Sequence, residues 1–268
     1  MGNATAANAE QAALLRIERS GAVLTVALNR PAKRNALNDG IILEIGECFA
    51  KLPEDIGAVV IHGIGDHFSS GLDLSELTEH DATEGLRHSQ MWHRVFDRIQ
   101  YSRVPVIAAL KGAVIGGGLE LACAAHIRVA EPSAYFALPE GQRGIFVGGG
   151  GSVRLPRLIG VARMTDMMLT GRVYSATEGS AYGFAQYLVD EGGALNKALE
   201  LAERIASNAP LTNFAVLQAL PMIAESNPQT GLLMESLMAT VAQSDKEAKR
   251  RIRAFLEHKT AKVKPGSK

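Results

Sequence analysis

The sequence of 268 residues predicts an α/β fold, in which a coil of strand–turn–helix units is followed by a region made only of helices. The first observation is a pattern that occurs three times between residues 58 and 158, where an apolar strand leads through a glycine-bearing turn to a helix. The second is that strand signals stop near residue 196, after which apolar residues recur at helical spacing. We therefore expect a core domain over residues 13–195 and a helical lid or oligomerisation region over residues 196–268.

A β-hairpin and a helix are expected at the start of the core. Residues 15–28 have β-type patterning on both sides of Ser20 and Gly21, which suit a turn. Pro31 ends the second strand, because proline has no N–H to donate to a β-ladder. A helix is then expected over residues 38–52.

Three strand–turn–helix units follow. They span residues 58–74, 104–121 and 134–158, and a helix that carries Val95 and Phe96 is expected between the first two. The spacing is too irregular for a short-period solenoid, but it is consistent with a coil of such units. In the first two units, the glycine turn is expected to stand at the start of a helix.

Four helices are expected beyond the core. The first is amphipathic over residues 198–206, and the second lies between breaks at Pro210 and Pro221. The third covers residues 232–237, and the last places its apolar residues on one side over residues 248–259. No linker in this region is long enough to separate a second independent domain.

Composition and charge are those of an ordinary globular protein. Hydrophobic residues make up 47% of the chain, charged residues make up 21%, and the formal net charge is zero. Nothing global therefore attracts the protein to nucleic acid or to a membrane surface. The last segment, residues 245–268, is an exception, with nine Lys or Arg against three Asp or Glu. A solvated basic tail and a phosphate-facing surface are both open interpretations.

The sequence contains no motif for a metal or for a separate cofactor. It lacks the P-loop, the dinucleotide-binding glycine pattern and the nucleophile elbow. Its seven histidines never adopt a close metal-ligand spacing. We therefore expect no metal site, and we expect the chemistry to come from side chains and backbone amides.

Several features favour the cytoplasm. Cys48 and Cys123 lie far apart in apolar contexts, which is typical of reduced thiols in a core. No stretch approaches the ~20 apolar residues that span a bilayer. Residues 1–12 lack the basic start and the apolar core of a secretory signal.

Glu120 and Glu140 are the strongest candidates for catalysis. They stand twenty residues apart, and each is tied to a glycine-rich turn, at residues 116–118 and 148–151. Burying carboxylates and ordering glycine runs both cost free energy, so their combination indicates a site. Amides at a helix start stabilise a developing negative charge, while two acids transfer protons. Structural roles stay open, with Glu120 complementing a helix dipole and Glu140 serving only a turn.

Further motifs occur in a fixed order along residues 13–260. They are Asn29-Arg30-Pro31, Asn35-Ala36-Leu37, Phe68 to Leu74, Pro105 to Gly112, Gly116 to Leu121, Leu138-Pro139-Glu140, Thr170-Gly171, Ala176 and Gly183. Taken together and in this order, they resemble the motifs of the crotonase (enoyl-CoA hydratase/isomerase) superfamily.

This resemblance implies a crotonase-like spiral of β-β-α units with a C-terminal helical trimerisation region, assembled as a homotrimer or as a homohexamer of two trimers. It implies an acyl-CoA thioester as the substrate, so coenzyme A belongs to the substrate and no cofactor is expected. No nucleic-acid or membrane partner is expected. By motif position, the amides of Leu72 and Gly117 would form the oxyanion hole, and Glu120 and Glu140 would be the two catalytic glutamates.

The same motifs imply a set of residues that contact the acyl-CoA. They are Lys33, Ala36, Ser70, Gly71, Asp73, Leu74, Gly116, Gly148, Phe255 and Lys259. In the family, the loop of Lys33 meets coenzyme A, and the position of Phe255 and Lys259 touches the nucleotide bound to a neighbouring subunit. A plain surface cation remains an alternative for Lys259. Trp92 and Met91 either line the acyl pocket or pack in the core.

The presence of both glutamates favours hydration over other reactions of this family. A thioester activates its conjugated double bond toward water, and two nearby carboxylates push their pKa values apart, which supplies an acid and a base. The sequence leaves open which glutamate is which. The alternatives are a hydratase that also hydrolyses the thioester (methylthioacryloyl-CoA hydratase type), an enoyl-CoA isomerase, and a non-catalytic acyl-CoA or RNA-binding relative. Departures from the family pattern at Val147, at Ser69-Ser70 and at Ala248 are expected to change the pocket more than the reaction.

Overall fold

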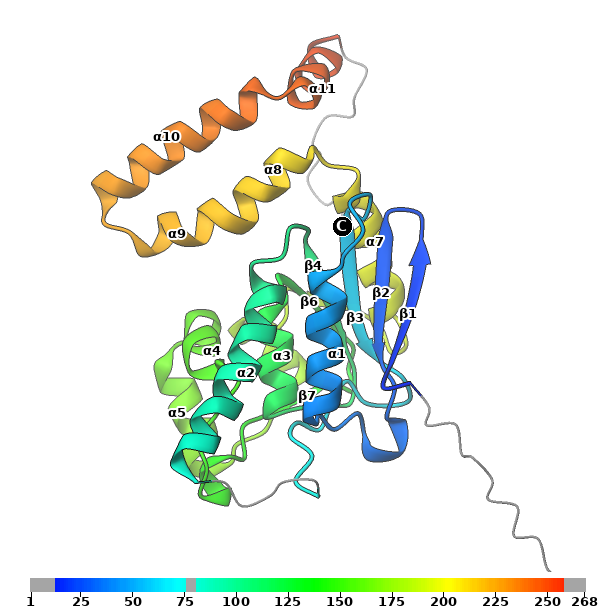
Figure 1. The fold of residues 1–268 in the computed structure, drawn as a ribbon, viewed down its shortest axis with the longest axis vertical. Coiled ribbons are helices and arrows are strands. Elements are labelled where there is room, and N and C mark those ends of the chain that lie inside the picture. Colours follow the sequence, from blue (N-terminus) through cyan, green and yellow to red (C-terminus); the bar gives the residue numbers. More distant parts are fainter. Residues whose placement is uncertain (1–12, 76–80, 258–268) are drawn as a thin grey trace, which may run out of the picture.

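A six-stranded sheet forms the centre of the protein, for which a computed structural model describes residues 13–75 and 81–257 (Figure 1). Only the hairpin at its edge is antiparallel, and all other neighbours are parallel. In spatial order the strands are β1 (Leu15–Ser20), β2 (Val23–Leu28), β3 (Ala58–Gly63), β4 (Val106–Leu110), β6 (Ile127–Ala130) and β9 (Tyr187–Leu188).

A second sheet of three short strands lies beside the first. Its strands are β5 (Ala113–Ile115), β7 (Tyr135–Ala137) and β8 (Tyr174–Ser175). The chain places β4 in the large sheet and β5 in the small one before a helix begins, and β6 and β7 repeat this alternation. The expected spiral of β-β-α units is therefore confirmed.

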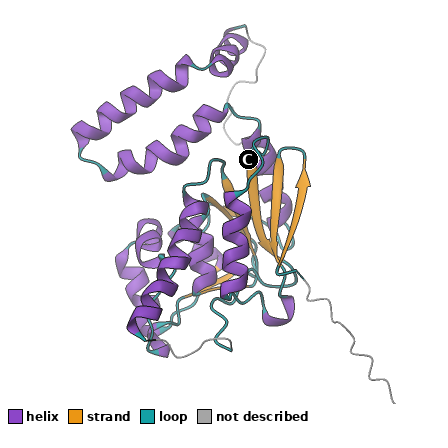
Figure 2. Ribbon diagram, in the orientation of Figure 1, coloured by secondary structure: helices purple, strands orange, loops and turns teal. Residues whose placement is uncertain are grey.

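Seven helices of the described chain surround the two sheets, as the purple ribbons of Figure 2 show. They are α1 (Asp39–Ala50), α2 (Ala82–Gln100), α3 (Gly117–Ala124), α4 (Gly151–Ile159), α5 (Val161–Thr170), α6 (Ala176–Tyr182) and α7 (Ala194–Ala206). Two 3₁₀ turns, Pro31–Lys33 and Gly141–Arg143, belong to the connecting loops. The main core packs one face of the large sheet against the buried sides of α1, α2 and α3, whereas α7 covers the other face with small residues such as Ala198 and Ala202.

The expected helix start after Gly71 is wrong. Leu72 instead forms a parallel bridge with Leu37, and the next helix within the described residues is α2, which begins at Ala82. The reason is a distant contact, because the N–H of Leu37 donates to the carbonyl of Gly71 and the N–H of Asp73 donates to the carbonyl of Leu37. The start of α2 is fixed separately by a capping box of Asp81 and Glu84. The glycine turn of the first unit thus supplies an extended segment.

The expected break at Pro221 is also wrong. Helix α8 (Pro210–Phe214) continues through a π-helical segment (Ala215–Ala219) into α9 (Leu220–Glu225). The N–H of Leu220 donates to the carbonyl of Ala215, five residues back. This wider turn lets the helix pass the proline, which has no N–H for a regular α-helical bond.

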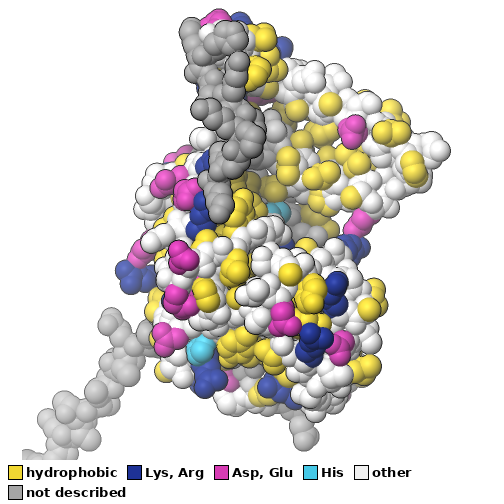
Figure 3. All heavy atoms as spheres, turned by 180° about the vertical axis from the view of Figure 1, so that it is seen from behind, with side chains coloured by type: hydrophobic (Ala, Val, Ile, Leu, Met, Phe, Trp, Pro, Cys, Tyr) yellow, Lys and Arg dark blue, Asp and Glu magenta, His cyan; other side chains and the backbone are white. Residues whose placement is uncertain are grey.

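Helices α8 and α9, together with α10 (Pro228–Ser244) and α11 (Lys246–Leu256), form a C-terminal arm that extends away from the sheets (Figure 1). Figure 3 shows hydrophobic side chains gathered over this arm. Those that are exposed include Phe214, Val216, Leu220, Met222, Leu232, Leu233, Leu237 and Val241. The division of the chain at residue 196 stays a prediction, although α7 packs on the large sheet and the arm begins at Pro210.

Within the described ranges, no helix is both long enough and apolar enough to cross a membrane.

Candidate active site

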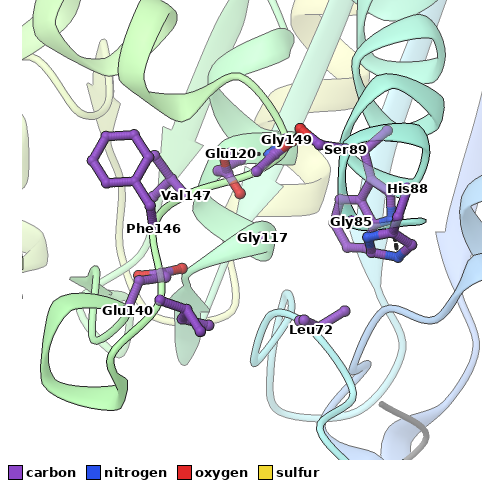
Figure 4. A pocket seen from close by; sticks show the side chains of 13 residues that line it. Leu72, Gly85, His88, Ser89, Gly117, Glu120, Glu140, Phe146, Val147 and Gly149 are labelled. Carbon is purple, nitrogen blue, oxygen red and sulfur yellow. Dashed lines mark hydrogen bonds between the residues drawn. The ribbon is translucent and has the colours of Figure 1, made fainter. Parts of the chain in front are cut away.

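A cavity of about 370 Å³ lies between α2, the start of α3 and the loop that leads to α4 (Figure 4). Its lining consists of Leu72, Gly85, His88, Ser89, Trp92, Gly117, Glu120, Glu140, Ile145, Phe146, Val147, Gly148 and Gly149. The structure therefore brings together both candidate glutamates, both candidate oxyanion amides and Gly148, which come from separate parts of the sequence.

Glu120 stands in the first turn of α3 and is 3% exposed. Its Oε1 accepts hydrogen bonds from the N–H of Gly149 at 2.8 Å and the N–H of Gly151 at 2.7 Å. Burial raises the pKa of Glu120, while these amides and the guanidinium of Arg154 partly offset that rise. The carboxylate is thus held in one orientation, at the inner wall of the cavity.

Glu140 follows β7 and enters the same cavity from the opposite side (Figure 4). Its Oε2 is buried and has no hydrogen-bond partner among the described residues. Burial raises the pKa of Glu140 to about 7, and the charge of Glu120 adds to the rise. An unpartnered buried carboxyl with such a pKa is suited to exchange a proton near neutral pH.

The turn at Gly116 makes room for Glu140. Gly116 has φ 51°, a conformation that favours glycine, and a Cβ at this position would lie 2.5 Å from Oε1 of Glu140. The glycine run before α3 therefore serves both the helix start and the position of the second acid.

Glu140→Gln is expected to gain stability relative to the unchanged protein as the pH rises. Because the folded pKa of about 7 lies above the ordinary value of 4.5, the folded carboxyl keeps a proton that the unfolded chain releases. Its contribution to stability is fully present below the unfolded pKa and is lost as the pH rises through the folded pKa. The difference in free energy of unfolding, from denaturant titrations, should therefore grow between pH 4.5 and 7 and then level off. A difference that does not change with pH would contradict this assignment.

Leu72 and Gly117, whose backbone N–H groups are the predicted oxyanion donors, both line the cavity beside the acids. The bridge to Leu37 uses the carbonyl of Gly71 and the N–H of Asp73, so it leaves the N–H of Leu72 directed away from that bridge. The N–H of Gly117 belongs to the first residue of α3, where regular helical partners are missing. The two groups are close, since a Cβ on Gly117 would lie 3.6 Å from the nitrogen of Leu72.

A second cavity of about 420 Å³ adjoins the first at Leu72. Its lining includes the predicted contact residues Lys33, Ala36, Ser70, Asp73 and Leu74. Predicted residues from two distant segments thus line one continuous surface, beside the paired amides.

Asp73 organises the wall of this second cavity. Its Oδ2 accepts hydrogen bonds from Arg30 Nη2 at 2.8 Å and from Lys33 Nζ at 2.9 Å, and Oδ1 accepts one from Ser75 Oγ at 2.6 Å. Burial by itself would raise the pKa of Asp73, but the hydrogen bonds from Ser75, Lys33 and Arg30 hold it well below its usual range. The carboxylate therefore fixes two cations at the edge of the cavity.

Of the other predicted contact residues, Gly71 and Gly116 adjoin lining residues of the cavities but belong to neither lining. Phe255 is on α11 in the C-terminal arm and is exposed, and Lys259 lies outside the described residues. Of the two candidates on α2, Trp92 lines the first cavity, whereas Met91 packs against the core.

Sequence reasoning missed His88 and Ser89, which line the cavity from α2. The Nε2 of His88 lies 2.8 Å from Asp39 Oδ1 and 3.2 Å from the indole nitrogen of Trp92, and Ser89 Oγ donates to the carbonyl of Gly148 at 2.7 Å. The available signal was helical spacing, because His88 lies one turn before Trp92 on the same face.

No group of three or more potential metal ligands occurs within residues 13–75 and 81–257.

Two buried carboxyls beside two backbone amides, on a spiral of β-β-α units, are suited to acid–base chemistry on a substrate in the cavity. A family model described as enoyl-CoA hydratase/isomerase matches residues 18–265. The chain belongs to the enoyl-CoA hydratase/isomerase family.

Individual relatives agree with this membership over nearly their whole length. The chain is 33% identical to the short-chain-enoyl-CoA hydratase of Clostridium acetobutylicum, over 90% of this chain and 94% of the relative. It is 34% identical to the 2,3-dehydroadipyl-CoA hydratase of Escherichia coli, over 92% and 97%. A crystal structure of a proposed enoyl-CoA hydratase from Rhodopseudomonas palustris CGA009 is 78% identical, with a TM-score of 0.90 over 93% of this chain and 97% of that one.

Proposed function

We propose that the protein is an enoyl-CoA hydratase, which adds water across the α,β double bond of an acyl-CoA thioester. The observation that carries this proposal is the meeting of Glu120, Glu140 and the amides of Leu72 and Gly117 at one cavity. The family membership and the hydratase names of its relatives agree with it.

The reaction uses the amides and the acids together. The thioester oxygen accepts hydrogen bonds from the N–H groups of Leu72 and Gly117, which stabilise the negative charge that develops as water attacks the β-carbon. One glutamate takes a proton from the water while the new C–O bond forms, and a proton is delivered to the α-carbon. The overall change adds one OH and one H, so no external oxidant or reductant is required.

The second cavity is the proposed place for the coenzyme A part of the substrate. Lys33, Ala36, Ser70 and Leu74 line it, and Leu72 links it to the acids. The cations at Lys33 and Arg30 are chemically suited to phosphate oxygens. Coenzyme A enters as part of the substrate, and we propose no further cofactor.

An assay with the purified protein tests the function directly. The loss of enoyl-thioester absorbance is followed across several acyl lengths, and the expected 3-hydroxyacyl product is identified by mass spectrometry. Release of the free thiol of coenzyme A would favour the hydrolytic alternative, and a shifted double bond would favour isomerisation. Absence of any change in the thioester would contradict an enzymatic function. It would favour the alternative of a non-catalytic protein that binds acyl-CoA or RNA.

We also propose that the C-terminal arm assembles the protein into a homotrimer or a homohexamer of two trimers. The support is the exposed apolar surface of the arm, since such a surface is commonly covered by a partner subunit. Phe255 and Lys259 would then approach the nucleotide bound to a neighbouring subunit. Nucleic acid and membrane partners are not part of this proposal.

Sedimentation equilibrium is expected to give three or six copies of the chain. The double variant Leu233→Glu and Leu237→Glu should give smaller species, because it places charges on a surface that is exposed in the single chain and covered in the assembly. Glu235→Gln, on the same helix, is the matched control and should assemble normally. An unchanged mass for the double variant, or a monomeric unchanged protein, would contradict the proposed role of the arm.

A cytoplasmic location is proposed as well. Its support is that Cys48 and Cys123 are both free thiols, as is usual in a reducing compartment.

A further inference from the structure

Arg154 is a buried cation directly behind the candidate active site. It belongs to α4, its side chain is 7% exposed, and it is not part of the lining of the first cavity. A buried guanidinium is costly unless its donors are satisfied, so its partners indicate what it holds in place.

The guanidinium joins three elements. Its Nη1 donates to the carbonyl of Gly149 at 2.9 Å, its Nη2 lies 2.6 Å from Oδ1 of Asp97, and its Nε donates to Oε1 of Gln100 at 2.5 Å. Asp97 and Gln100 are both on the last turn of α2. Arg154 therefore ties the glycine run before α4 to the end of α2.

The same glycine run holds Glu120. Gly149 uses its carbonyl to accept from Arg154 and its N–H to donate to Glu120, and the N–H of Gly151 donates to the same carboxylate oxygen. Gly150, between them, has φ 93°, and a Cβ there would lie against Nη1 of Arg154. The guanidinium, the glycine run and the carboxylate thus form one packed unit.

The end of α2 is itself anchored. The carbonyl of Gln100 lies 2.9 Å from Nε2 of His126, and Nδ1 of His126 accepts a hydrogen bond from the N–H of Val106 at the start of β4. Burial lowers the pKa of His126 to about 4, so the ring is neutral at physiological pH, as an acceptor at Nδ1 requires. The end of α2, which carries Asp97 and Gln100, is therefore tied to the central sheet.

We propose that Arg154 is a positioning residue for the hydration reaction, which fixes the Gly149–Gly151 segment and through it the orientation and charge of the Glu120 carboxylate. This inference rests on the proposed function, because it assigns a purpose to the orientation of Glu120. Arg154 itself does not touch the substrate cavity, so its effect passes through the backbone of the glycine run.

The charge of Arg154 gives this role a distinctive signature. The titratable groups coupled to Glu120 among the described residues are Arg154 from α4, whose charge acts on Glu120, and Glu140 and Cys123, whose pKa values the charge of Glu120 raises. Arg154 lowers the pKa of Glu120, against the larger effect of burial. Its removal should therefore move the ionisation of Glu120 to higher pH, whether Glu120 acts as the acid or as the base.

The experiment compares Arg154→Met with Arg157→Met. Arg157 lies one turn further along α4, is exposed, and pairs with Glu225, so it controls for loss of an arginine from this helix. In Arg154→Met we expect kcat to fall by about 10²-fold with KM changed less than about threefold, and one limb of the kcat–pH profile to move to higher pH. Arg157→Met should keep the kcat, the KM and the pH profile of the unchanged protein.

Arg154→Lys separates charge from geometry. The lysine keeps the positive charge but cannot make the three directed hydrogen bonds, so the pH limb should return toward its original position while kcat stays reduced. If Arg154→Met keeps the original pH profile, the inference is overturned. This holds also if kcat falls, as long as the fall matches the smaller folded fraction that circular dichroism measures.

A second readout does not depend on turnover. Titration of the Glu120 carboxyl carbon by NMR, in protein labelled at glutamate and assigned with Glu120→Gln, should give a higher pKa in Arg154→Met than in Arg157→Met. An equal pKa in both variants would overturn the inference even if activity changed. If the unchanged protein fails to hydrate enoyl thioesters, the proposed function is lost, and this titration still decides whether Arg154 controls Glu120.

Discussion

Glu120→Gln and Glu140→Gln are each expected to lower kcat for enoyl-CoA hydration by about 10²–10⁴-fold, the usual contribution of a proton-transfer group. Glutamine has the shape of glutamate but cannot take up or release the proton. The fold should remain intact for a separate reason at each site. In Glu120→Gln the amide oxygen of the new side chain can still accept from Gly149 and Gly151, and Glu140 Oε2 has no hydrogen-bond partner to lose among the described residues.

Glu131→Gln is the matched control for this pair. Glu131 is also buried, and it accepts hydrogen bonds from Ser133 Oγ at 3.2 Å and from the N–H of Ala194 at 3.4 Å, away from the cavity. Its variant should therefore keep kcat close to that of the unchanged protein. Steady-state kinetics with crotonyl-CoA checks all three, and near-normal hydration by either active-site variant would rule out a mechanism that uses two glutamates.

Gly117→Pro is expected to reduce kcat by at least about 10²-fold, because it removes one of the two donors to the thioester oxygen. Loss of one oxyanion donor costs on the order of 3 kcal/mol in known enzymes. Proline is tolerated at the first residue of a helix, and Gly117 is the first residue of α3, so the helix itself should still form. The affinity for substrate should fall less than kcat, since the oxygen carries more negative charge in the transition state than in the bound thioester.

Gly117→Ala separates the lost donor from the added side chain. A Cβ at this position would lie 2.9 Å from Cζ3 of Trp92, and alanine and proline both introduce it. Alanine keeps the N–H, however, so its kcat should exceed that of the proline variant by at least about tenfold. Equal losses in the two variants would mean that Gly117 matters only for packing against Trp92. A loss of binding as large as the loss of kcat would mean that its amide serves only the turn.

Local sequence signals predict most of the elements that carry the site. The helix expected over residues 38–52 from its apolar residues is present at Asp39–Ala50, and the side chain of Asn38 caps it by accepting from the N–H of Ile41. The helix start at Gly117 follows from a glycine turn between an apolar strand and an apolar helix. In both cases neighbouring residues contain the whole signal, so no distant contact is needed.

Two helix boundaries that the sequence predicts wrongly show which features local residue patterns cannot predict. The glycine turn at Gly71 predicts a helix start, but pairing of Leu72 with Leu37, a residue far away in sequence, makes the segment extended. Pro221 predicts a break, but a π-type turn carries the helix past it. Each outcome depends on a backbone partner that the local pattern does not specify.

The sequence by itself was enough to predict the family, the spiral of β-β-α units, and the two candidate glutamates with their glycine turns. Each of these predictions depends only on which residue types occur and in what order along the chain. Only the tertiary structure decided which groups meet. The parallel register of the sheet and the packing of the helices place the amide of Leu72 beside Gly117. They leave Glu140 Oε2 without a hydrogen-bond partner among the described residues. They also bring Asp97 and Gln100, from the end of α2, into contact with Arg154 on α4. Burial and distance set the ionisation of a carboxyl and the direction of an amide, and both arise only when segments far apart in the chain are packed together.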